Sequence, residues 1–523
     1  MSPRRALPAV VLLLLVHAAA ASRADDWKAE ANARIEAMRK RDAVVAVVDE
    51  LGRGIPGARL GARQASHHFA FGSCVTRNLT YDPPYQSFFR EHFEWAVLEN
   101  DSKWFMNEPW RDYLNFASAD EIVEYCEERG IRLRGHCIFW AKEEYTPPWC
   151  RPLPEDELRD EVGERLVDAV PRYRGRFRHW DVNNEMLDGD FFRSRLGPDI
   201  EPWMFVRAHE LDPDADLFVN DYSIIAGSES RTAAYIDQVR SLLSRGAPVH
   251  GVGVQGHFWG DVVDPLAILA RLDQLSVLGL PVWVTEYDAV DADENRRADK
   301  LENLYRSAFS HPSVEGILMW GFWAGSHWRG ADAAIVDLDW RVNAAGQRYE
   351  QLLAEWTTTV PLEARPDGAL AFRGFHGTYK VRIEAFPDPP RTEVVELLPG
   401  DGTASWVFPL AGTVCLPAGE VEELQLAHAP ASAATALTWR APSEPAGMVL
   451  LYDLLRSTRA DEFGAAAACL LSDGGDASAT DAETPAAGSA FYYLARGRNR
   501  CPSEEGPLGA RSDGVPREGR SCP

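Results

Sequence analysis

Between residues 67 and 323 the sequence alternates short apolar segments with longer helical ones. The apolar segments are predicted β-strands at 67–75, 95–100, 131–140, 177–185, 216–222, 250–258, 281–288 and 316–323. The segments between them, such as SADEIVEYCEERG and RTAAYIDQVRSLLSRG, have the residue pattern of helices. Eight such strand–helix units predict an α/β chain with a (β/α)8 TIM barrel over 67–355. An open, doubly wound sheet is the alternative, but it needs a glycine-rich phosphate-binding turn, and none follows the first strand.

Polar and aromatic residues gather where these strands end. The strand at 177–185 passes from Val182 directly into Asn183, Asn184 and Glu185, and other strands end in LEN, NDY, QGH, TEYD and WGFW. In a barrel all these ends lie on one face, and that face is where barrel enzymes build their active sites. The sequence therefore predicts a site distributed over several strand ends.

The composition narrows the kind of ligand. The net charge is −25 and no basic patch stands out, which argues against a nucleic-acid partner. The balance suits a soluble protein that acts on neutral material. We expect a monomer with no membrane partner.

The first residues have the features of a secretory signal peptide. Arg4 and Arg5 precede the short apolar stretch 10–16, and small residues follow it up to Ala21. We predict a signal peptide at 1–24 and an extracellular protein; the alternative is an uncleaved anchor.

Several of the strand-end motifs are familiar as a set. WDVNNE, GVGVQGH and VTEYD resemble motifs of glycoside hydrolase family 10, the xylanase family. LENDSKW, RGHCIFW, NDY and MWGFWAGSHW match further motifs of that family in the same order, over about 67–355. RGHCIFW, WGFWAGSHWR and FRGFHGTY are closer to the plant- and animal-type branch. The resemblance implies a secreted retaining endo-β-1,4-glycanase, with xylan as the expected substrate and no metal or cofactor.

The resemblance assigns the two catalytic residues. Glu185 ends the fourth strand and is implied as the acid/base, and Glu286 ends the seventh and is implied as the nucleophile. Retaining hydrolysis needs two carboxyl groups roughly 5–5.5 Å apart across the scissile bond. These strands lie on opposite sides of the barrel mouth, so the two groups can converge. The alternative for either residue is a solvated glutamate at a strand end.

The resemblance also implies a set of substrate-binding residues at the strand ends. They are Glu99, Asn100, Lys103, His136, Trp140, Asn184, Tyr222, Gln255, His257, Trp320 and Trp328. In the family pattern Asn184 binds the sugar 2-hydroxyl and His257 orients the nucleophile. Asp288 is expected to support His257 or the loop that follows it.

Some of these residues have structural alternatives. Trp320, Trp328 and His136 could belong to the core, and Tyr222 could serve packing alone. We interpret His67, His68 and His179 as structural.

The sequence departs from the family pattern near the site. Ala141 stands where bacterial members carry a His, the following loop AKEEYTPPW is acidic, and Asn183 and Tyr287 replace more apolar residues. These changes put the substrate in doubt rather than the mechanism. A cellulase-like glycosidase acting on another β-glycan and a non-catalytic carbohydrate-binding protein therefore stay open as alternatives.

The remainder of the chain is predicted to be mainly β-structure. Residues 25–66 read as a short charged helix and a β-hairpin, and 356–428 as a small β appendage. Residues 429–523 resemble a fibronectin type III β-sandwich. Of the eight cysteines, Cys501 and Cys522 bracket a Gly/Pro-rich tail and are the favoured disulfide, although sequence alone does not fix the pairing.

Overall fold

The computed structural model describes residues 27–49, 52–260, 262–385, 388–410, 418–429, 434–443, 450–498 and 506–522. The described chain forms two compact units. One contains the chain up to Ala37 together with Phe69–Glu355, and the other contains Met38–His68 and the chain from Trp356 onward. The predicted signal peptide at 1–24 lies outside the described residues. No helix within these ranges is long and apolar enough to cross a membrane.

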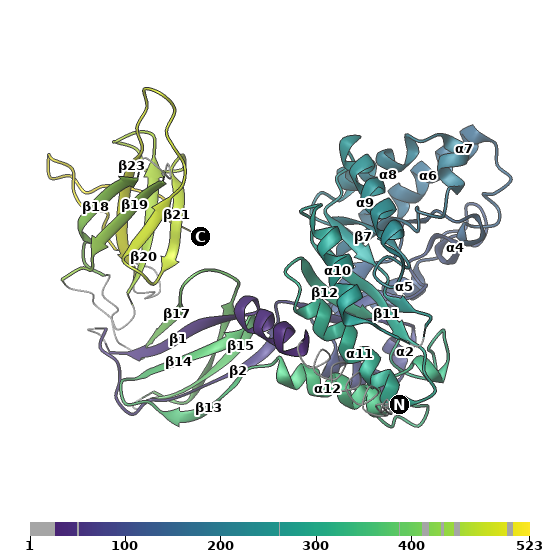
Figure 1. Ribbon diagram of the computed structural model, residues 1–523, viewed down its shortest axis with the longest axis horizontal. Coiled ribbons are helices and arrows are strands. Elements are labelled where there is room, and N and C mark those ends of the chain that lie inside the picture. Colours follow the sequence, from purple (N-terminus) through teal and green to yellow (C-terminus); the bar gives the residue numbers. More distant parts are fainter. Residues whose placement is uncertain are drawn as a thin grey trace, which may run out of the picture. The chain divides into compact units, whose positions relative to one another are not determined.

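The first unit is the predicted barrel of parallel strands (Figure 1). Its strands are β3 (Ala70–Val75), β4 (Trp95–Leu98), β5 (Arg132–Gly135), β6 (Phe139–Trp140), β7 (Phe177–Asn184), β8 (Asp216–Asp221), β9 (Gly251–Val254), β10 (His257–Phe258), β11 (Val282–Ala289) and β12 (Val314–Met319). Neighbours pair in chain order, β12 pairs with β3, and β9 pairs with β11 to close the ring. The sixth and seventh predicted strands therefore meet as expected for a (β/α)8 fold, and the predicted fold class is confirmed.

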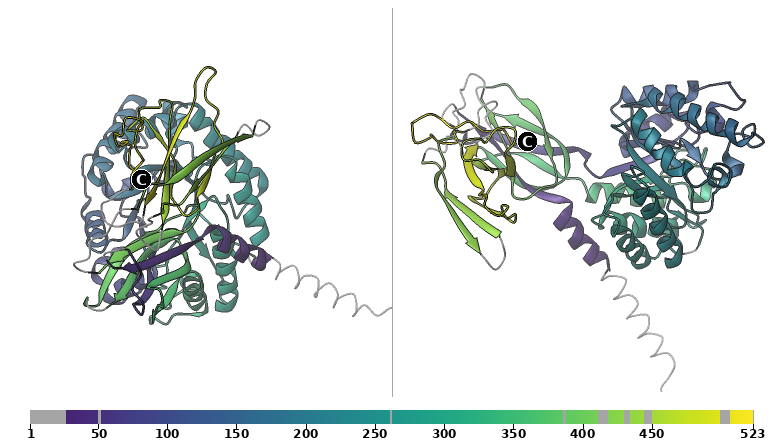
Figure 2. Two further views of the ribbon diagram at one scale, coloured as in Figure 1. Left: turned by 90° about the vertical axis from the view of Figure 1, so that its left-hand side faces the viewer. Right: turned by 90° about the horizontal axis from the view of Figure 1, so that it is seen from above.

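Helices surround these strands (Figure 2). They are α2 (Asn78–Tyr81), α3 (Pro83–His92), α4 (Trp104–Asn107), α5 (Ala117–Glu127), α6 (Glu155–Ala169), α7 (Phe191–Leu196), α8 (Ile200–Leu211), α9 (Glu229–Ser244), α10 (Pro265–Ser276), α11 (Glu294–Phe309) and α12 (Ala344–Glu355). Several begin at a side-chain cap: Asp264 and Asp293 each accept two backbone N–H groups at the starts of α10 and α11. A further helix covers 27–38, where the charged helix was predicted.

Aromatic side chains fill the barrel interior below the strand ends. The His179 ring lies 5.1 Å from Trp95 and 4.5 Å from Trp283, measured between ring centroids. Burial and the charge of Arg134 hold the pKa of His179 well below its ordinary value. A neutral, enclosed imidazole agrees with the structural role predicted for His179.

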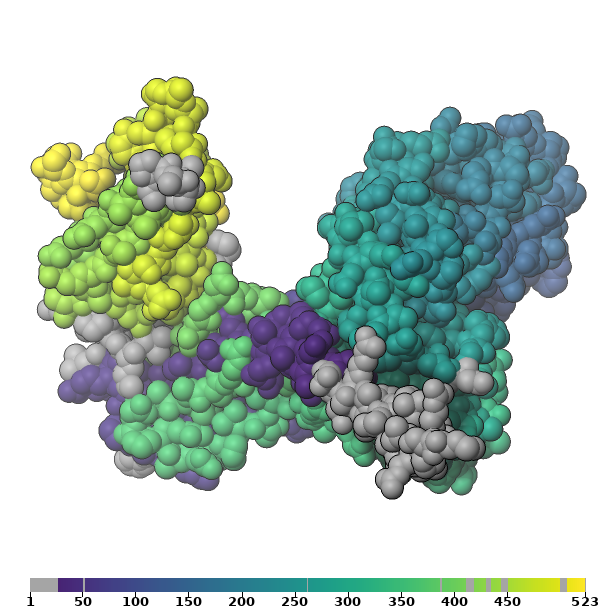
Figure 3. Space-filling view, viewed as in Figure 1, coloured from purple at the N-terminus to yellow at the C-terminus, as the bar shows by residue number. Residues whose placement is uncertain are grey.

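Two sheets of the second unit combine strands that precede the barrel in the sequence with strands that follow it. β1 (Lys40–Val48) lies between β14 (Ala369–Phe375) and β17 (Ala404–Pro409). β2 (Arg59–His67) lies between β13 (Thr359–Ala364) and β15 (Gly377–Glu384), and β16 (Arg391–Leu397) completes that sheet. In the space-filling view part of the purple segment, which carries β1 and β2, accordingly lies beside green residues of this unit (Figure 3).

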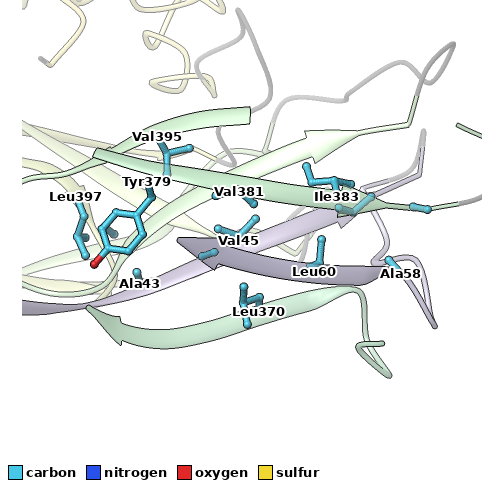
Figure 4. Packing of buried hydrophobic residues seen from close by; sticks show 14 of the residues in the cluster. Ala43, Val45, Ala58, Leu60, Leu370, Tyr379, Val381, Ile383, Val395 and Leu397 are labelled. Carbon is cyan, nitrogen blue, oxygen red and sulfur yellow. The ribbon is translucent and has the colours of Figure 1, made fainter. Parts of the chain in front are cut away.

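The predicted hairpin in 25–66 is therefore wrong, although both of its strands form. β1 and β2 belong to different sheets. Their apolar faces meet in one buried cluster, in which Val45 and Leu60 lie near Leu370 and Val381 (Figure 4). Alternation along a strand shows which face is buried, but it does not identify the partner strand.

The C-terminal part holds two three-stranded antiparallel sheets. One contains β18 (Glu422–Ala429), β19 (Ala434–Arg440) and β22 (Ser478–Asp481). The other contains β20 (Leu451–Ser457), β21 (Ala468–Gly474) and β23 (Tyr492–Arg498). Small all-β modules thus follow the barrel. The fibronectin-type resemblance stays a prediction, and β18 begins before the domain boundary predicted at residue 429 and ends at that residue.

The disulfide in this region differs from the favoured pairing. Cys522 is bonded to Cys469 on β21, while Cys501 lies outside the described residues. Phe463 pairs with Gly519, so the end of the chain runs back beside the segment that leads into β21. Sequence spacing favoured the nearer cysteine, but this return of the chain brings Cys469 and Cys522 together.

Candidate active site

A cavity of about 530 Å³ is formed by residues at the carboxyl ends of the barrel strands. Its lining residues are Glu99, Asn100, Lys103, Phe105, His136, Trp140, Lys142, Tyr145, Glu185, Tyr222, Gln255, His257, Trp259, Glu286, Trp320 and Trp328. Most of the residues predicted from the sequence are therefore brought together. Asn184 and Asp288 do not line the cavity, and both are buried. Asp288 contacts the lining residue His257, whereas Asn184 is linked to Glu286 through Asn220.

Glu286 on β11 is almost fully buried and has partners for both oxygens. Oε1 accepts a hydrogen bond from Asn220 Nδ2 at 2.7 Å, and Oε2 lies 3.2 Å from His257 Nε2. His136 Nδ1 lies 4.0 Å from Oε1. Burial favours the neutral acid, but the charges of His136 and His257 outweigh it and lower the pKa of Glu286. The arrangement favours an ionised carboxylate.

His257 lies between two carboxylates. Its Nδ1 is 3.1 Å from Asp288 Oδ1, on the side opposite Glu286. Burial alone lowers the pKa of His257, yet Asp288 and Glu286 together raise it to about 9. Asp288 also accepts hydrogen bonds from Trp328 Nε1 at 2.7 Å and from Arg329. Asp288 thus contacts His257 on the side away from Glu286, and its supporting role stays a prediction.

Glu185 follows the last residue of β7 and has a different setting. Its φ of 60° is a left-handed conformation that non-glycine residues rarely adopt, and such conformations gather at functional sites. Gln255 Nε2 donates to Oε1 at 2.9 Å, and Lys142 Nζ lies 3.0 Å from Oε2. The backbone N–H of Glu185 donates to the backbone carbonyl oxygen of Asn220 at 2.9 Å, and this hydrogen bond holds the turn against β8.

Asn220 connects the two carboxyl-bearing strands and was not predicted as a site residue. Its single amide nitrogen donates to Glu286 Oε1 at 2.7 Å and to Asn184 Oδ1 at 3.0 Å. Its Oδ1 accepts from Thr285 at 2.6 Å. The Nδ2 of buried Asn184 has no hydrogen-bond partner within the described residues. That free donor suits the sugar contact predicted for Asn184.

His136 contacts a buried ion pair formed by Asp181 and Arg134. Asp181 accepts from His136 Nδ1 at 2.9 Å and also pairs with Arg134. Burial raises the pKa of Asp181, but Arg134 and His136 outweigh it and lower that pKa. His136 was predicted to be either a core residue or a site residue. Its imidazole is part of a buried network and also lines the cavity.

One wall carries the residues predicted for the glycone side. Lys103 Nζ donates to Asn100 Oδ1 at 3.0 Å and lies 4.6 Å from the centre of the Trp140 ring. Burial raises the pKa of Glu99, although Lys103 opposes this shift. Tyr145 stacks on Trp140 with ring centroids 3.9 Å apart. A flat aromatic surface beside polar groups is the surface a sugar ring needs.

Three further tryptophans line the cavity. Trp320 is buried and lies in one core cluster with Trp95 and Trp283, yet it also lines the cavity. Trp328 is half exposed and its ring is 6.0 Å from that of Trp259. Arg329 stacks on Trp259 at 3.9 Å. Trp320 therefore joins core to site, whereas Trp328 belongs to the rim.

Sequence reasoning missed four lining residues: Phe105, Lys142, Tyr145 and Trp259. Lys142 and Tyr145 lie in AKEEYTPPW, a segment that the sequence marked only as a departure from the family pattern. Trp259 follows GVGVQGHF directly, and Phe105 follows LENDSKW. Each is adjacent to a recognised motif, so proximity to these motifs was the available signal.

A family model places the barrel among known proteins. The model described as glycosyl hydrolase family 10 matches residues 61–347. Xylanase 10B of Thermotoga maritima has a crystal structure of the same fold. Its sequence identity is 24%, its TM-score is 0.51, and the match covers 55% of this chain and 95% of that one.

Curated relatives extend the comparison. The anti-sigma-I factor RsgI6 of Acetivibrio thermocellus is 48% identical over 382 residues, which is 73% of this chain and 50% of that protein. Endo-1,4-beta-xylanase 2 of Arabidopsis thaliana is 42% identical over 333 residues, covering 63% of this chain and 31% of the plant protein. The chain thus spans half or less of the length of these two relatives. Beta-1,4-xylanase of Dictyoglomus thermophilum is 32% identical, with 77% of its length covered.

Proposed function

The chain belongs to glycosyl hydrolase family 10, and from that premise we propose that it is a secreted, retaining endo-β-1,4-xylanase. The proposal rests on one observation: Glu185 and Glu286 line the same cavity but have different hydrogen-bond and ion-pair partners. Glu286 lies between His257 and the Asn220 amide, and its pKa is lowered. Glu185 contacts Lys142 and Gln255 instead. Unlike environments for two carboxyl groups are the usual basis for dividing acid and nucleophile roles.

The proposed reaction runs in two displacements. In the first, Glu286 attacks the anomeric carbon while Glu185 gives its proton to the departing glycosidic oxygen, so that one C–O bond forms and another breaks. In the second, Glu185 takes a proton from water, and the resulting nucleophile displaces Glu286 from the sugar. Two inversions at one carbon retain its configuration. The sugar leaves with a hydroxyl, and both glutamates return to their starting protonation states.

The lining of the cavity supports a neutral pyranose chain as the substrate. Trp140, Trp320 and Trp328 offer aromatic surfaces, and Asn100 and Gln255 offer amide groups beside them. Aromatic faces with a few polar groups provide an apolar contact surface and orient a bound ligand. Xylan is the proposed polymer because relatives in the same family are named as xylanases.

Release of reducing sugar from glucuronoxylan by the purified protein tests the proposal. The wild type is expected to release sugar, and Glu286→Ala and Glu185→Gln are expected to lose turnover while they keep the wild-type circular dichroism spectrum. Near-wild-type activity in either variant would overturn the catalytic assignment. Hydrolysis of cellulose or another β-glycan, but not of xylan, would overturn xylan as the proposed substrate. Binding of xylan without hydrolysis would favour a carbohydrate-binding protein instead of an enzyme.

A further inference from the structure

Lys142 is a charged cavity residue to which the proposed reaction gives no role. It follows β6 by two residues, in the segment that differs from the family pattern. Its Nζ lies 3.0 Å from Glu185 Oε2, and the Lys142 side chain is 21% exposed. The other Glu185 oxygen is held by Gln255. A cation and an amide together therefore hold both oxygens of the proposed acid/base.

Groups outside the reacting pair hold Lys142 in place. Its Nζ donates to Tyr222 Oη at 3.3 Å and lies 4.4 Å from the centre of that ring. The Tyr222 hydroxyl donates in turn to Asp188, which is paired with Arg231. Burial lowers the pKa of Lys142, but its contacts with Glu185 and Tyr222 outweigh burial and raise it. The ammonium is therefore charged throughout the range in which a carboxyl group titrates.

Other ionisable groups surround the Lys142–Glu185 pair. Tyr222, His257 from β10 and Glu286 from β11 line the same cavity, and Asp221 at the end of β8 interacts electrostatically with Glu185. Asp188, in the turn after β7, accepts from Tyr222 and pairs with Arg231 from α9. Asp221 is fully buried; burial chiefly, and the charge of Glu185 in part, raise its pKa to about 7. Nearby carboxylates favour the neutral form of a carboxyl group, and a cation in direct contact favours its ionised form. Lys142 is that cation.

We propose that Lys142 is a positioning residue for Glu185, which holds Oε2 and makes the carboxyl group release its proton at a lower pH. This inference rests on the proposed function of Glu185. An acid/base must be neutral in the first displacement and ionised in the second, and the Lys142 ammonium favours the second form. Lys142 thereby sets the upper pH limit of the reaction and supports the step in which water is activated.

The pH dependence of kcat/KM for soluble xylo-oligosaccharides tests the proposal. Lys142→Met keeps an unbranched side chain, one atom shorter, but removes its charge, so the alkaline limb of the variant is expected about one pH unit above that of the wild type. The acid limb, which belongs to Glu286, is expected to stay in place. Lys142→Arg is expected to restore the alkaline limb. Lys380→Met removes the charge of an exposed lysine on β15, in the second unit, and is expected to match the wild type.

A direct titration separates this inference from the reaction itself. The carboxyl carbon of Glu185 is followed by NMR in protein with labelled glutamate, and the signal is assigned by its absence in Glu185→Gln. Its titration midpoint is expected at higher pH in Lys142→Met than in the wild type. Equal midpoints overturn the proposal even if the wild type degrades xylan. A wild type that degrades no β-glycan overturns the proposed function, and the titration still decides the role of Lys142.

Discussion

Asn220 shows how much of this site depends on one side chain. Its amide joins Asn184 to Glu286, and its oxygen accepts from Thr285, so three strands meet at one residue. The motif NDY indicated that this strand end belongs to the site, but it pointed to Tyr222 rather than Asn220. Motifs identify strand ends, whereas a hydrogen bond between strands depends on register, which the sequence of a single strand does not contain.

Asn220→Ala is expected to lower kcat/KM by about 100-fold, because a small misplacement of a reacting group has an effect of this size. The free energy of unfolding should fall by about 1–3 kcal/mol, since Asn184 and Thr285 lose a partner. Kinetics on xylo-oligosaccharides and thermal unfolding measure the two effects. Asn295→Ala, exposed near the start of α11, is the control. Equal losses in the two variants would contradict this role for Asn220.

His257 gives a prediction for stability against pH. Its pKa is raised to about 9 in the folded protein, above the ordinary value of about 6.5 for an unfolded chain. The folded state therefore binds the proton more tightly. This contribution is fully present below about pH 6.5 and is lost as the pH rises through about 9.

The melting temperature is accordingly expected to fall more steeply between about pH 6.5 and 9 in the wild type than in His257→Gln. His428→Gln, which removes an exposed imidazole on β18, should keep the wild-type slope. Parallel curves for the wild type and His257→Gln would show that His257 is not held as described.

At the scale of elements, the sequence predicted where the barrel strands lie but not that two of them are each divided into two shorter strands. The segments 131–140 and 250–258 were each read as one strand, but they form β5 with β6 and β9 with β10. Gly256, with φ of 80°, separates β9 from β10. The breaks turn polar residues such as Gln255 toward the cavity, and apolar patterning gives no signal for them.

Gly253 on β9 lies against the site from within the barrel wall. A Cβ at this position would lie 2.5 Å from Asn220 Oδ1, so Gly253→Ala must displace the amide that holds Glu286. We expect a loss of about 1–3 kcal/mol in the free energy of unfolding, together with lower activity.

Gly163→Ala on α6 provides the matched control, because the nearest atom to its added Cβ is Trp203 Cη2 at 4.0 Å. Alanine in this helix should add about 0.5–1 kcal/mol to stability. Chemical unfolding of both variants makes the comparison. A Gly253→Ala variant as stable and active as the wild type would rule out the close approach to Asn220.

At the scale of the whole molecule, the sequence predicted a barrel followed by small β modules, and it misassigned the strands before the barrel. β1 and β2 pair with strands that follow residue 356. Such partners lie some three hundred residues away in the chain, as Lys40 opposite Phe375 illustrates. Local alternation cannot report pairing at that distance, so the hairpin was the simpler interpretation.

The Cys469–Cys522 disulfide closes a loop with a sequence separation of 53 residues. Replacing both cysteines with serine is expected to lower the stability of the second unit by about 2–4 kcal/mol. Xylan hydrolysis should be unchanged, since neither residue lines the cavity. Calorimetry of the variant, compared with the reduced wild type, measures this. The prediction fails if the unfolding profile is unaffected by both treatments.

In the proposed mechanism Glu286 forms a covalent bond to the sugar, while Glu185 first donates a proton and then accepts one. Incubation with an activated 2-deoxy-2-fluoro-xylobioside, followed by mass spectrometry of the digested protein, tests it most directly. A slow second displacement should leave one fluorinated disaccharide attached to the peptide that contains Glu286, and Glu286→Ala should carry none. Attachment to a different carboxylate, or hydrolysis of xylan with inversion and no adduct, would contradict the account.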